Sequence, residues 1–275
     1  MDPFDRIPGL NANLYVVPAM GSDQQSYAIW FLVITMLKDP AVFVFDVDGC
    51  LLDSINYFAS FVPSVYEKFG IKPSPETIAK LRSDILGLLS GKSSRILIAR
   101  LILHGAKSMG LNAMQRLRFL VYLQRIYKQN ITGVGYIPGA LETIKGLKAA
   151  GYKVALFTTG SKKDFKIKFR DKQDLVQLLD DYVTRDDVKQ MKPSPEGLLL
   201  IKRRLGIVNP RRMVMVGDMH HDIEAGIAAG AITIGVKTGV CTDAELKAAG
   251  ASLVLDSVQD ILPNLAQIEA LMERS

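Results

Sequence analysis

The pattern of hydrophobic and polar residues shows its first strong element at positions 41–45, where five apolar residues, Ala-Val-Phe-Val-Phe, follow one another. Most are β-branched or aromatic and none alternates with a polar residue, which is typical of a strand buried on both faces of a parallel sheet. The run ends at Asp46-Val47-Asp48-Gly49, because aspartate is a poor strand former and glycine permits backbone angles that other residues avoid. Residues 41–54 therefore predict a central strand and the turn that leaves it.

Residues 55–131 change to a helical spacing of apolar positions, with Gly70, Gly91 and Gly110 between the segments. The predicted helices are 55–69, 76–89, 93–109 and 113–129, with no strand among them. We expect a helical cap domain over 55–131, inserted between the first strand and the next α/β unit. Two interpretations stay open, a plain helical bundle or a lid over the turn at Asp46, because an insertion that leaves the core there must lie near it.

From residue 137 onward, strand and helix patterns alternate, which is typical of a parallel sheet with crossover helices. Strands are predicted at 152–158, 181–184, 213–216, 231–236 and, at the edge, 252–255. Helices are predicted at 138–150, 162–179, 194–205, 220–229, 242–249 and 258–272. The predicted fold class is α/β, with a Rossmann-like parallel-sheet core over 41–54 and 132–275 and an inserted α-helical cap domain.

Residues 1–40 precede the first predicted strand and form an N-terminal extension to which we assign no role. Their longest apolar run, residues 27–37, is about half of the ~20 residues that a helix needs to span a bilayer. It also lacks the basic region and the small-residue cleavage site of a signal peptide. We therefore expect no membrane partner.

The composition of the 275 residues, 48% hydrophobic and 23% charged, is that of an ordinary globular protein. The net charge of +6 invites a nucleic-acid interpretation, but the basic residues are spread along the chain. The densest basic run, residues 162–172, also carries acids, so we interpret it as a solvated helix face and expect no nucleic-acid partner. A basic surface also attracts small anionic substrates. Cys50 and Cys241 form neither a disulfide framework nor a metal motif, which favours a cytoplasmic location.

Two carboxylates, Asp46 and Asp48, follow the first strand at the edge where open α/β sheets place their sites. The functional interpretation is a carboxylate pair that serves a reaction. The alternative is an ordinary exit from a strand into a turn, because aspartate and glycine are common turn residues.

Two further polar segments stand where a predicted strand or loop meets a helix. The first is Thr158–Ser161 (Thr-Thr-Gly-Ser), whose hydroxyl and N–H groups suit an anion at a helix N-terminus. Its alternative is a helix cap formed by Thr159 or Ser161. The second is Lys192, whose backbone is restricted by Pro193 and whose ammonium suits a phosphate or carboxylate. Its alternative is a solvent-exposed lysine.

A fourth polar segment follows the strand at 213–216, where Asp218 and Asp222 lie four residues apart. Together with the carboxylates after the first strand they would form an all-oxygen cluster, which suits Mg²⁺. His220 and His221 suggest zinc instead, but adjacent helix residues do not face one direction and no further Cys or His completes a set. We therefore favour Mg²⁺ as the cofactor.

The order of these four segments resembles the haloacid dehalogenase superfamily of phosphohydrolases over about residues 41–272. The motif positions are Asp46-Val47-Asp48-Gly49 for the first, Thr158 for the second, Lys192 for the third, and Gly217-Asp218 with Asp222 for the fourth. The helical insertion is similar to the cap that this family places after its first motif. Residues 230–236 and 250–254 also resemble the phosphoglycolate phosphatase and β-phosphoglucomutase branch.

The resemblance implies that Asp46 is a nucleophile that forms an aspartyl-phosphate, and that Asp48 is the general acid and then the general base. The implied catalytic residues are Asp46, Asp48, Thr158 and Lys192, and the implied phosphate-binding residues are Gly49, Thr158, Thr159 and Lys192. The implied Mg²⁺ ligands are Asp46, the backbone carbonyl of Asp48, Asp218 and, directly or through a water, Asp222. Dehalogenase members lack an aspartate at the position of Asp48, so its presence favours phosphoryl transfer over C–halogen cleavage.

We therefore predict a Mg²⁺-dependent phosphatase that hydrolyses a small phosphomonoester, phosphoglycolate-like or a sugar phosphate. A phosphosugar mutase of the β-phosphoglucomutase type uses the same four motifs and is the first alternative. A non-catalytic binding protein is the less favoured one. Polar candidates for substrate contact in the cap are Asn56, Arg82, Lys92 and Arg95, each with an ordinary surface residue or helix cap as its alternative. The expected partner is a small phosphorylated metabolite, and the expected assembly is a monomer or a homodimer.

Overall fold

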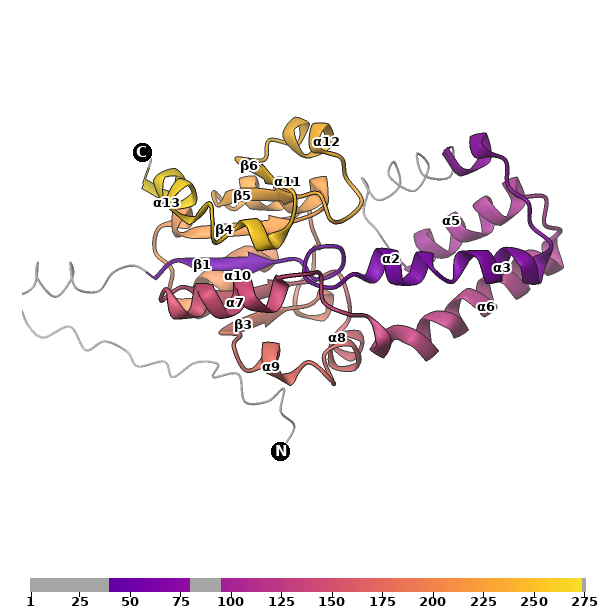
Figure 1. Ribbon diagram of the computed structural model, residues 1–275, viewed down its shortest axis with the longest axis horizontal. Helices are drawn as coiled ribbons and strands as arrows, with labels where there is room; N and C mark the ends of the chain where they lie inside the picture. Colours follow the sequence, from indigo (N-terminus) through magenta and orange to yellow (C-terminus); the bar gives the residue numbers. More distant parts are fainter. Residues whose placement is uncertain (1–39, 80–94, 274–275) are drawn as a thin grey trace, which may run out of the picture.

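The computed structural model describes residues 40–79 and 95–273, and its centre is one sheet of six parallel strands (Figure 1). The strand order is β3-β2-β1-β4-β5-β6, so β1 lies in the middle. The strands are β1 (Val42–Phe45), β2 (Lys153–Phe157), β3 (Asp181–Val183), β4 (Met213–Gly217), β5 (Ile232–Val236) and β6 (Leu253–Leu255). The predicted α/β fold is confirmed, and the predicted edge strand is β6.

Helices cover both faces of this sheet, and the side chains of β1 divide between the two faces because successive residues of a strand point in opposite directions. The core helices are α7 (Ala140–Ala149), α8 (Lys162–Lys168), α9 (Gln173–Val176), α10 (Glu196–Leu205), α11 (His220–Ala228), α12 (Asp243–Ala248) and α13 (Leu265–Glu273). Phe43 and Phe45 pack in the cluster that includes α7, α8 and α13, whereas Val42 and Val44 pack in the cluster with α10 and α11. Fully burying each such side chain contributes about 1.5–3 kcal/mol relative to exposure.

The inserted segment is helical where it is described, and it lies beyond the carboxyl end of β1, away from the sheet (Figure 1). Its helices are α2 (Ser54–Ala59), α3 (Val62–Phe69), α5 (Arg95–Ser108) and α6 (Ala113–Asn130), followed by the 3-10 helix η2 (Ile131–Gly133). Helices α3, α5 and α6 share a small hydrophobic cluster of their own, with Val65, Ala106 and Phe119 buried in it, whereas Tyr57 and Phe58 of α2 pack against the core. Of the helix predicted at 76–89, residues 76–79 are helical and the rest lies outside the described residues.

Three predicted helices are each divided in the structure. The helix predicted at 55–69 is α2 and α3, and proline stands in the first turn of α3, where it removes a helical N–H donor. The helix predicted at 258–272 is η5 (Val258–Asp260) and α13, with Pro263 between them. The helix predicted at 162–179 is α8 and α9, separated by a turn at 169–172. Hydrophobic spacing alone continues through such breaks, so it does not mark them.

Both chain crossings between the core and the inserted segment lie side by side. The N–H of Asp53 donates to the carbonyl of Gly135 at 3.0 Å, and the N–H of Ile137 donates to the carbonyl of Leu51 at 2.9 Å. Leu52 forms an antiparallel bridge with Tyr136 between these bonds. The insertion therefore leaves and re-enters the core at one point, directly after the turn that follows β1.

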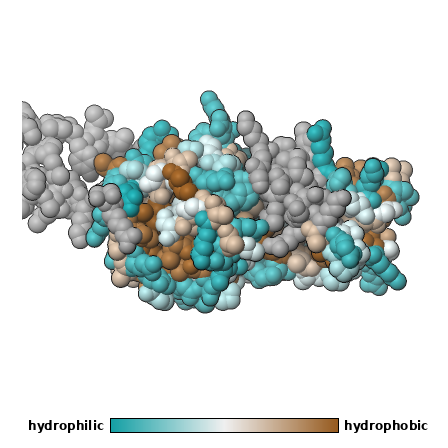
Figure 2. Space-filling model, turned by 90° about the horizontal axis from the view of Figure 1, so that it is seen from above, coloured by the Kyte–Doolittle hydropathy of each residue, from teal (hydrophilic) through white to brown (hydrophobic). Residues whose placement is uncertain are grey.

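The surface of the molecule mixes hydrophilic and hydrophobic residues over the face seen in Figure 2. Among the helices within 40–79 and 95–273, none has the length and apolarity needed to cross a bilayer. The apolar run at 27–37 lies outside the described residues.

Candidate active site

The candidate site is built at the carboxyl ends of three neighbouring strands. Phe45, the last residue of β1, lies in register with Leu156 of β2 on one side and Val216 of β4 on the other. The residues that follow these strands therefore meet at one edge of the sheet. A hydrogen bond of 2.8 Å from the N–H of Asp46 to the carbonyl of Val216 continues the pairing into the site.

Lys192 joins two of the carboxylates at this edge. Its Nζ lies 2.5 Å from Oδ1 of Asp46 and 2.6 Å from Oδ1 of Asp222. The side chain of Lys192 is only 1% exposed, and its ammonium lies 4.9 Å from the centre of the Phe157 ring. The interpretation of Lys192 as a solvent-exposed lysine is therefore wrong, because the side chain is enclosed and paired.

Three buried carboxylates form a compact group. Oxygen atoms of Asp46, Asp218 and Asp222 all lie within 4.8 Å of one another. Oδ2 of Asp218 accepts a hydrogen bond from the N–H of Val240, and Oδ2 of Asp222 accepts one from the N–H of Met219, each at 3.0 Å. Within the described residues, these three carboxylates have the spacing of metal ligands, and the group contains neither histidine nor cysteine. Its all-oxygen composition is the one expected for Mg²⁺ rather than zinc.

Two glycines leave the space that Asp218 occupies. Gly49 has a φ of +83°, in the left-handed region, and a Cβ atom there would lie 2.7 Å from Oδ2 of Asp218. A Cβ atom on Gly239 would lie only 1.8 Å from the same oxygen. Thr238 fixes the first glycine further, since its hydroxyl donates to the carbonyl of Gly49 at 2.7 Å. The two loops thus enclose Asp218 with backbone on both sides.

The buried charged groups of the site shift one another's pKa values. Burial raises the pKa of Asp46 from 3.8 to about 7, although the Lys192 ammonium opposes the shift. Burial and then the neighbouring carboxylates of Asp222 and Asp46 hold the pKa of Asp218 well above its usual range. Burial opposes the charge of Lys192, but the same two partners raise the pKa of its ammonium. The raised pKa values of Asp46 and Asp218 show that the single ammonium of Lys192 does not balance three ionised carboxylates, an imbalance that a divalent cation would remove.

Asp48 lies outside this carboxylate group. Both of its carboxylate oxygens lie 2.5 Å from Nζ of Lys168, and Oδ1 also accepts a hydrogen bond from the hydroxyl of Ser54. The side chain of Asp48 is 35% exposed, whereas that of Lys168 is 7% exposed. A metal contact by Asp48 would therefore involve its backbone carbonyl, as the family resemblance implies, and would leave the carboxylate separate.

Lys168 is a residue that the sequence prediction missed. The interpretation of residues 162–172 as a solvated helix face is wrong for Lys168 and Lys172, because both side chains are buried. Burial opposes the charge of Lys168, but the Asp48 carboxylate raises the pKa of its ammonium. The spacing of the sequence carries this signal, because positions 165, 168, 169 and 172 follow a helical period and include the buried Phe165 and Phe169. A lysine on such an apolar face needs a buried partner.

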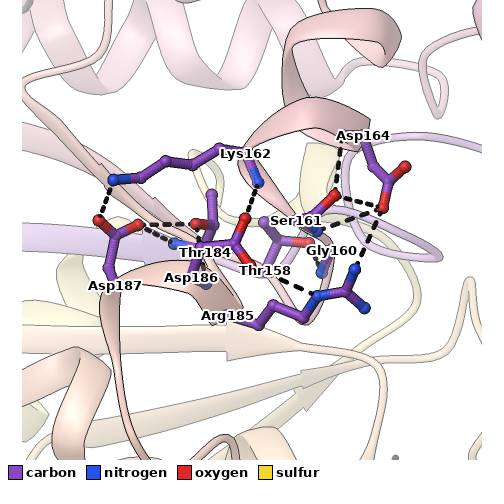
Figure 3. Close-up of polar contacts among 9 residues, drawn as sticks. All are labelled: Thr158, Gly160, Ser161, Lys162, Asp164, Thr184, Arg185, Asp186 and Asp187. Atoms are coloured by element: carbon purple, nitrogen blue, oxygen red, sulfur yellow. Dashed lines mark hydrogen bonds and ion pairs between the residues drawn. The ribbon is translucent and has the colours of Figure 1, made fainter. Parts of the chain in front are cut away.

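The segment after β2 divides into an enclosed threonine and a helix cap (Figure 3). Thr158 is buried, and its Oγ1 accepts a hydrogen bond of 3.0 Å from the N–H of Gly160. Ser161 is the N-cap of α8, accepting from the N–H of Asp164 at 3.1 Å. Thr159 is exposed. The helix-cap interpretation therefore holds for Ser161, while Thr158 faces inward with a hydroxyl proton left to donate.

A network of charges ties the loop after β2 to the loop after β3 (Figure 3). The N–H of Arg185 donates to the carbonyl of Gly160 at 3.1 Å, and its guanidinium lies 3.8 Å from a carboxylate oxygen of Asp164. Nζ of Lys162 lies 2.7 Å from Oδ1 of Asp187. These contacts hold the loop that carries Thr158 against its neighbour.

The polar residues proposed in the inserted segment have mixed outcomes. Asn56 is exposed and donates to Oδ1 of Asp53 at 2.8 Å, which fits an ordinary surface residue. Arg82 and Lys92 lie outside the described residues, and Arg95 begins α5 without a described side chain. Tyr127 of α6, which the sequence prediction did not include, lies near the core charges. Burial raises the pKa of its phenol, and the charges of Lys168 and Asp48 act on it with opposite signs.

The family whose members are described as haloacid dehalogenase-like hydrolases matches residues 43–236 of this chain. This span includes all four predicted motif segments, from Asp46 to Asp222. The chain belongs to the haloacid dehalogenase-like hydrolase family. The predicted family and the predicted enzyme class, a hydrolase, are confirmed.

Several known proteins are similar to this chain. Phosphoglycolate phosphatase 1 of Pseudomonas aeruginosa is 28% identical over 224 residues, which cover 82% of this chain and 79% of that protein. Pyrophosphatase PpaX of Bacillus mycoides is 38% identical over 127 residues, 46% of this chain and 58% of that protein. The crystal structure of a HAD family hydrolase from Deinococcus radiodurans R1, with bound phosphate and sodium, has a TM-score of 0.68 at 25% identity. That alignment covers 86% of this chain and 99% of the other.

Proposed function

We propose that this hydrolase is a Mg²⁺-dependent phosphatase that cleaves a small phosphomonoester through a phosphorylated Asp46. The observation that carries the proposal is the buried group of Asp46, Asp218 and Asp222 with Lys192 between two of its members. Phosphoryl transfer needs a nucleophile beside positive charge, because an anion must approach an anionic ester. A second carboxylate, Asp48, stands two residues from the nucleophile and outside the group, where a proton donor is needed.

In the first step, a carboxylate oxygen of Asp46 forms a bond to phosphorus while the bond between phosphorus and the alcohol oxygen breaks. Asp48 gives its proton to that leaving oxygen, and the alcohol departs. In the second step, Asp48 takes a proton from water, whose oxygen attacks phosphorus and breaks the bond to Asp46. Inorganic phosphate leaves, and both carboxylates return to their first state.

Lys192 and Thr158 support the transferred group in this proposal. The ammonium of Lys192, already 2.5 Å from Asp46, offsets the charge that develops on the phosphoryl oxygens. The Thr158 hydroxyl accepts from Gly160 and keeps its own proton to donate to a phosphoryl oxygen. Thr159, on the loop after β2, would add an N–H donor, whereas the N–H of Gly49 already donates to the carbonyl of Leu52 at 2.9 Å.

The imbalance of three carboxylates against one ammonium supports a bound Mg²⁺, which Asp46, Asp218, Asp222 and the backbone carbonyl of Asp48 would hold. When bound, the ion supplies Lewis-acid stabilisation of the phosphoryl charge. Lys192, which contacts two of these carboxylates, balances part of the charge that remains.

We propose that the helices of residues 55–131 form a cap domain over the core and select the substrate. Tyr127 is placed for this role because it lies near Lys168 and Asp48 from the side of the insert. The similarity to phosphoglycolate phosphatase 1 favours a small, doubly anionic ester such as phosphoglycolate. The partial similarity to a pyrophosphatase adds pyrophosphate to the compounds to be compared. The net charge of +6 favours anionic substrates in general.

Hydrolysis is favoured over the mutase alternative, because the matching family and the two curated relatives compared above carry hydrolase names. A non-catalytic binding protein is also not favoured. Such a protein has no need of three buried carboxylates, which lower stability unless a ligand neutralises them.

The test is release of inorganic phosphate from a panel of phosphomonoesters and pyrophosphate, with and without Mg²⁺. We expect hydrolysis that EDTA abolishes and added Mg²⁺ restores. Asp46→Asn should reduce it to background with an unchanged circular dichroism spectrum. Exposed Asp171→Asn, on the surface after α8, is the matched control and should keep full activity. Full activity in Asp46→Asn would contradict the proposal, and interconversion of sugar phosphates without phosphate release would establish the mutase.

A further inference from the structure

An ion pair between Lys168 and Asp48 stands apart from the buried carboxylate group. It joins the turn after β1 to α8, residues that are 120 positions apart in the chain. The ammonium lies 2.5 Å from both carboxylate oxygens, so its contact fixes the plane of the carboxylate as well as its position. Lys192 makes no such contact with Asp48, since its partners are Asp46 and Asp222.

Lys168 is anchored by the helix that carries it. Its neighbours on the same helical face, Phe165 and Phe169, are buried with ring centres 4.5 Å apart. Phe165 also stacks on Tyr182 of β3, with centres 4.4 Å apart and planes parallel within 1°. The base of the Lys168 side chain therefore has little freedom, and its ammonium reaches Asp48 from a fixed point.

A lysine at this position costs stability unless it is paired, because burying an ammonium removes its hydration. An apolar side chain would fill the same helical face without that cost. Lys168 is nevertheless charged, its side chain is only 7% exposed, and its ammonium contacts the Asp48 carboxylate. This pairing points to a role of Lys168 in the site.

We infer that Lys168 is a positioning residue that holds the Asp48 carboxylate at the leaving group of the substrate. The inference rests on the proposed function and deepens it. Ser54, at the start of α2, donates to the same carboxylate, so Asp48 is held from the core by Lys168 and from the insert by Ser54. These two contacts keep Asp48 out of the group formed by Asp46, Asp218 and Asp222.

This role has a distinct chemical signature, because Lys168 acts only through Asp48. A poor leaving group, such as the alkoxide of phosphoglycolate, needs protonation as the bond to phosphorus breaks. A good leaving group, such as p-nitrophenolate, departs without it. The loss on removing Lys168 must therefore depend on the leaving group, whereas a merely structural lysine would affect both esters equally.

The experiment compares kcat/KM for phosphoglycolate and p-nitrophenyl phosphate, because this constant reports the steps up to release of the alcohol. In Lys168→Met we expect a fall of about 10²–10³-fold for phosphoglycolate, within the range of general acid catalysis, and of less than about tenfold for the aryl ester. Lys168→Arg should recover part of the loss because it keeps the cation. Lys163→Met, an exposed lysine of the same helix, is the matched control and should match wild type on both esters.

Double variants separate positioning from a general loss of folding. Adding Lys168→Met to Asp48→Asn should change neither constant further, because the residue that Lys168 positions is already lost. Equal losses on both esters, or a further loss in the double variant, would overturn the inference. These outcomes leave the proposed function intact if wild type releases phosphate and Asp46→Asn does not. Absence of phosphate release by wild type from every ester would instead overturn the proposed function itself.

Discussion

In the proposed mechanism Asp46 attacks phosphorus as an anion, yet its side chain is buried beside two other carboxylates. Its backbone is fixed by the end of β1, and Lys192 lies against one of its oxygens. A buried carboxylate with raised pKa lowers the stability of the folded state when it ionises. The proposed nucleophile is therefore a residue whose ionised form destabilises the fold when no metal is bound, a conflict that is common at active sites.

The first prediction concerns how the loss of folding stability caused by ionised Asp46 depends on pH. The pKa of Asp46 is about 7 in the folded protein and 3.8 ordinarily, so the folded state binds the proton more tightly than the unfolded state. The contribution of Asp46 to stability is therefore lost as pH rises from about 4 to about 7. In EDTA, Asp46→Asn should melt at a higher temperature than wild type at pH 8, and the difference should shrink at pH 5. A constant difference between the two pH values, measured by differential scanning fluorimetry, would contradict this.

The second prediction concerns Gly239, where a Cβ atom would lie 1.8 Å from Oδ2 of Asp218. Gly239→Ala must push the Asp218 carboxylate away from its place beside Asp46 and Asp222. We expect a large loss of phosphatase activity and weaker Mg²⁺ binding, measured by titrating activity with the metal. The control is Gly135→Ala, because a Cβ atom on Gly135 would have no other atom within 4 Å.

At the residue scale, sequence reasoning predicted the members of the carboxylate group and Lys192, because each stands where a strand or loop meets a helix. It missed Gly239, since that glycine acts on Asp218 only through a contact between loops that are distant in sequence. It also missed Lys168 and Tyr127. Charged residues in a basic run are usually solvated, and only the packing of α8 in the folded protein shows that Lys168 is buried.

At the scale of single elements, α10 supports the site through a missing side chain. Gly197, in its first turn, faces the Phe157 ring, and a Cβ atom there would lie 2.3 Å from the ring. Phe157 in turn contacts the ammonium of Lys192. The close approach of α10 to β2 thus fixes the position of the Phe157 ring against which the Lys192 ammonium lies.

The third prediction follows from this packing. Alanine normally favours a helix over glycine by about 1 kcal/mol, but overpacking a core costs about 1–3 kcal/mol. Gly197→Ala should therefore lower the melting temperature, and displacement of Phe157 should reduce kcat through Lys192. Gly146→Ala in α7 meets only the flexible end of Leu262 and should keep its kcat. Unchanged kcat in Gly197→Ala would show that Phe157 does not support Lys192.

Element boundaries were less predictable than element types. The predicted strands all correspond to observed ones, because each is a short segment rich in β-branched, aromatic or other apolar residues, as is typical of strands in a parallel sheet. The helices at 55–69 and 258–272 divide where a proline stands, and the helix at 162–179 divides at a turn that brings Lys172 inward. Hydrophobic periodicity records which face is buried, and it does not record where a hydrogen-bonded turn is interrupted.

At the scale of the whole molecule, the proposed Mg²⁺ site would couple metal binding to folding, because the unfolded chain does not bring Asp46, Asp218 and Asp222 together. A ligand that binds only the folded state stabilises it by about 2.7 kcal/mol at a hundred times its dissociation constant.

The fourth prediction is that saturating Mg²⁺ raises the melting temperature of wild type by several degrees. Asp218→Asn, which removes one ligand and one buried charge, should respond much less. An equal rise in both proteins would mean that the ion acts elsewhere on the molecule.

The paired crossings at Leu51–Asp53 and Gly135–Ile137 have a consequence for how such enzymes diversify. Residues that face each other in antiparallel pairs lie about 5 Å apart, so the two ends of the insert are already neighbours. A helical segment of another length or composition fits between the same two ends without stretching the sheet. With the substrate-selecting role proposed for the insert, its replacement would change substrate preference while the residues at the end of β1 stay as they are.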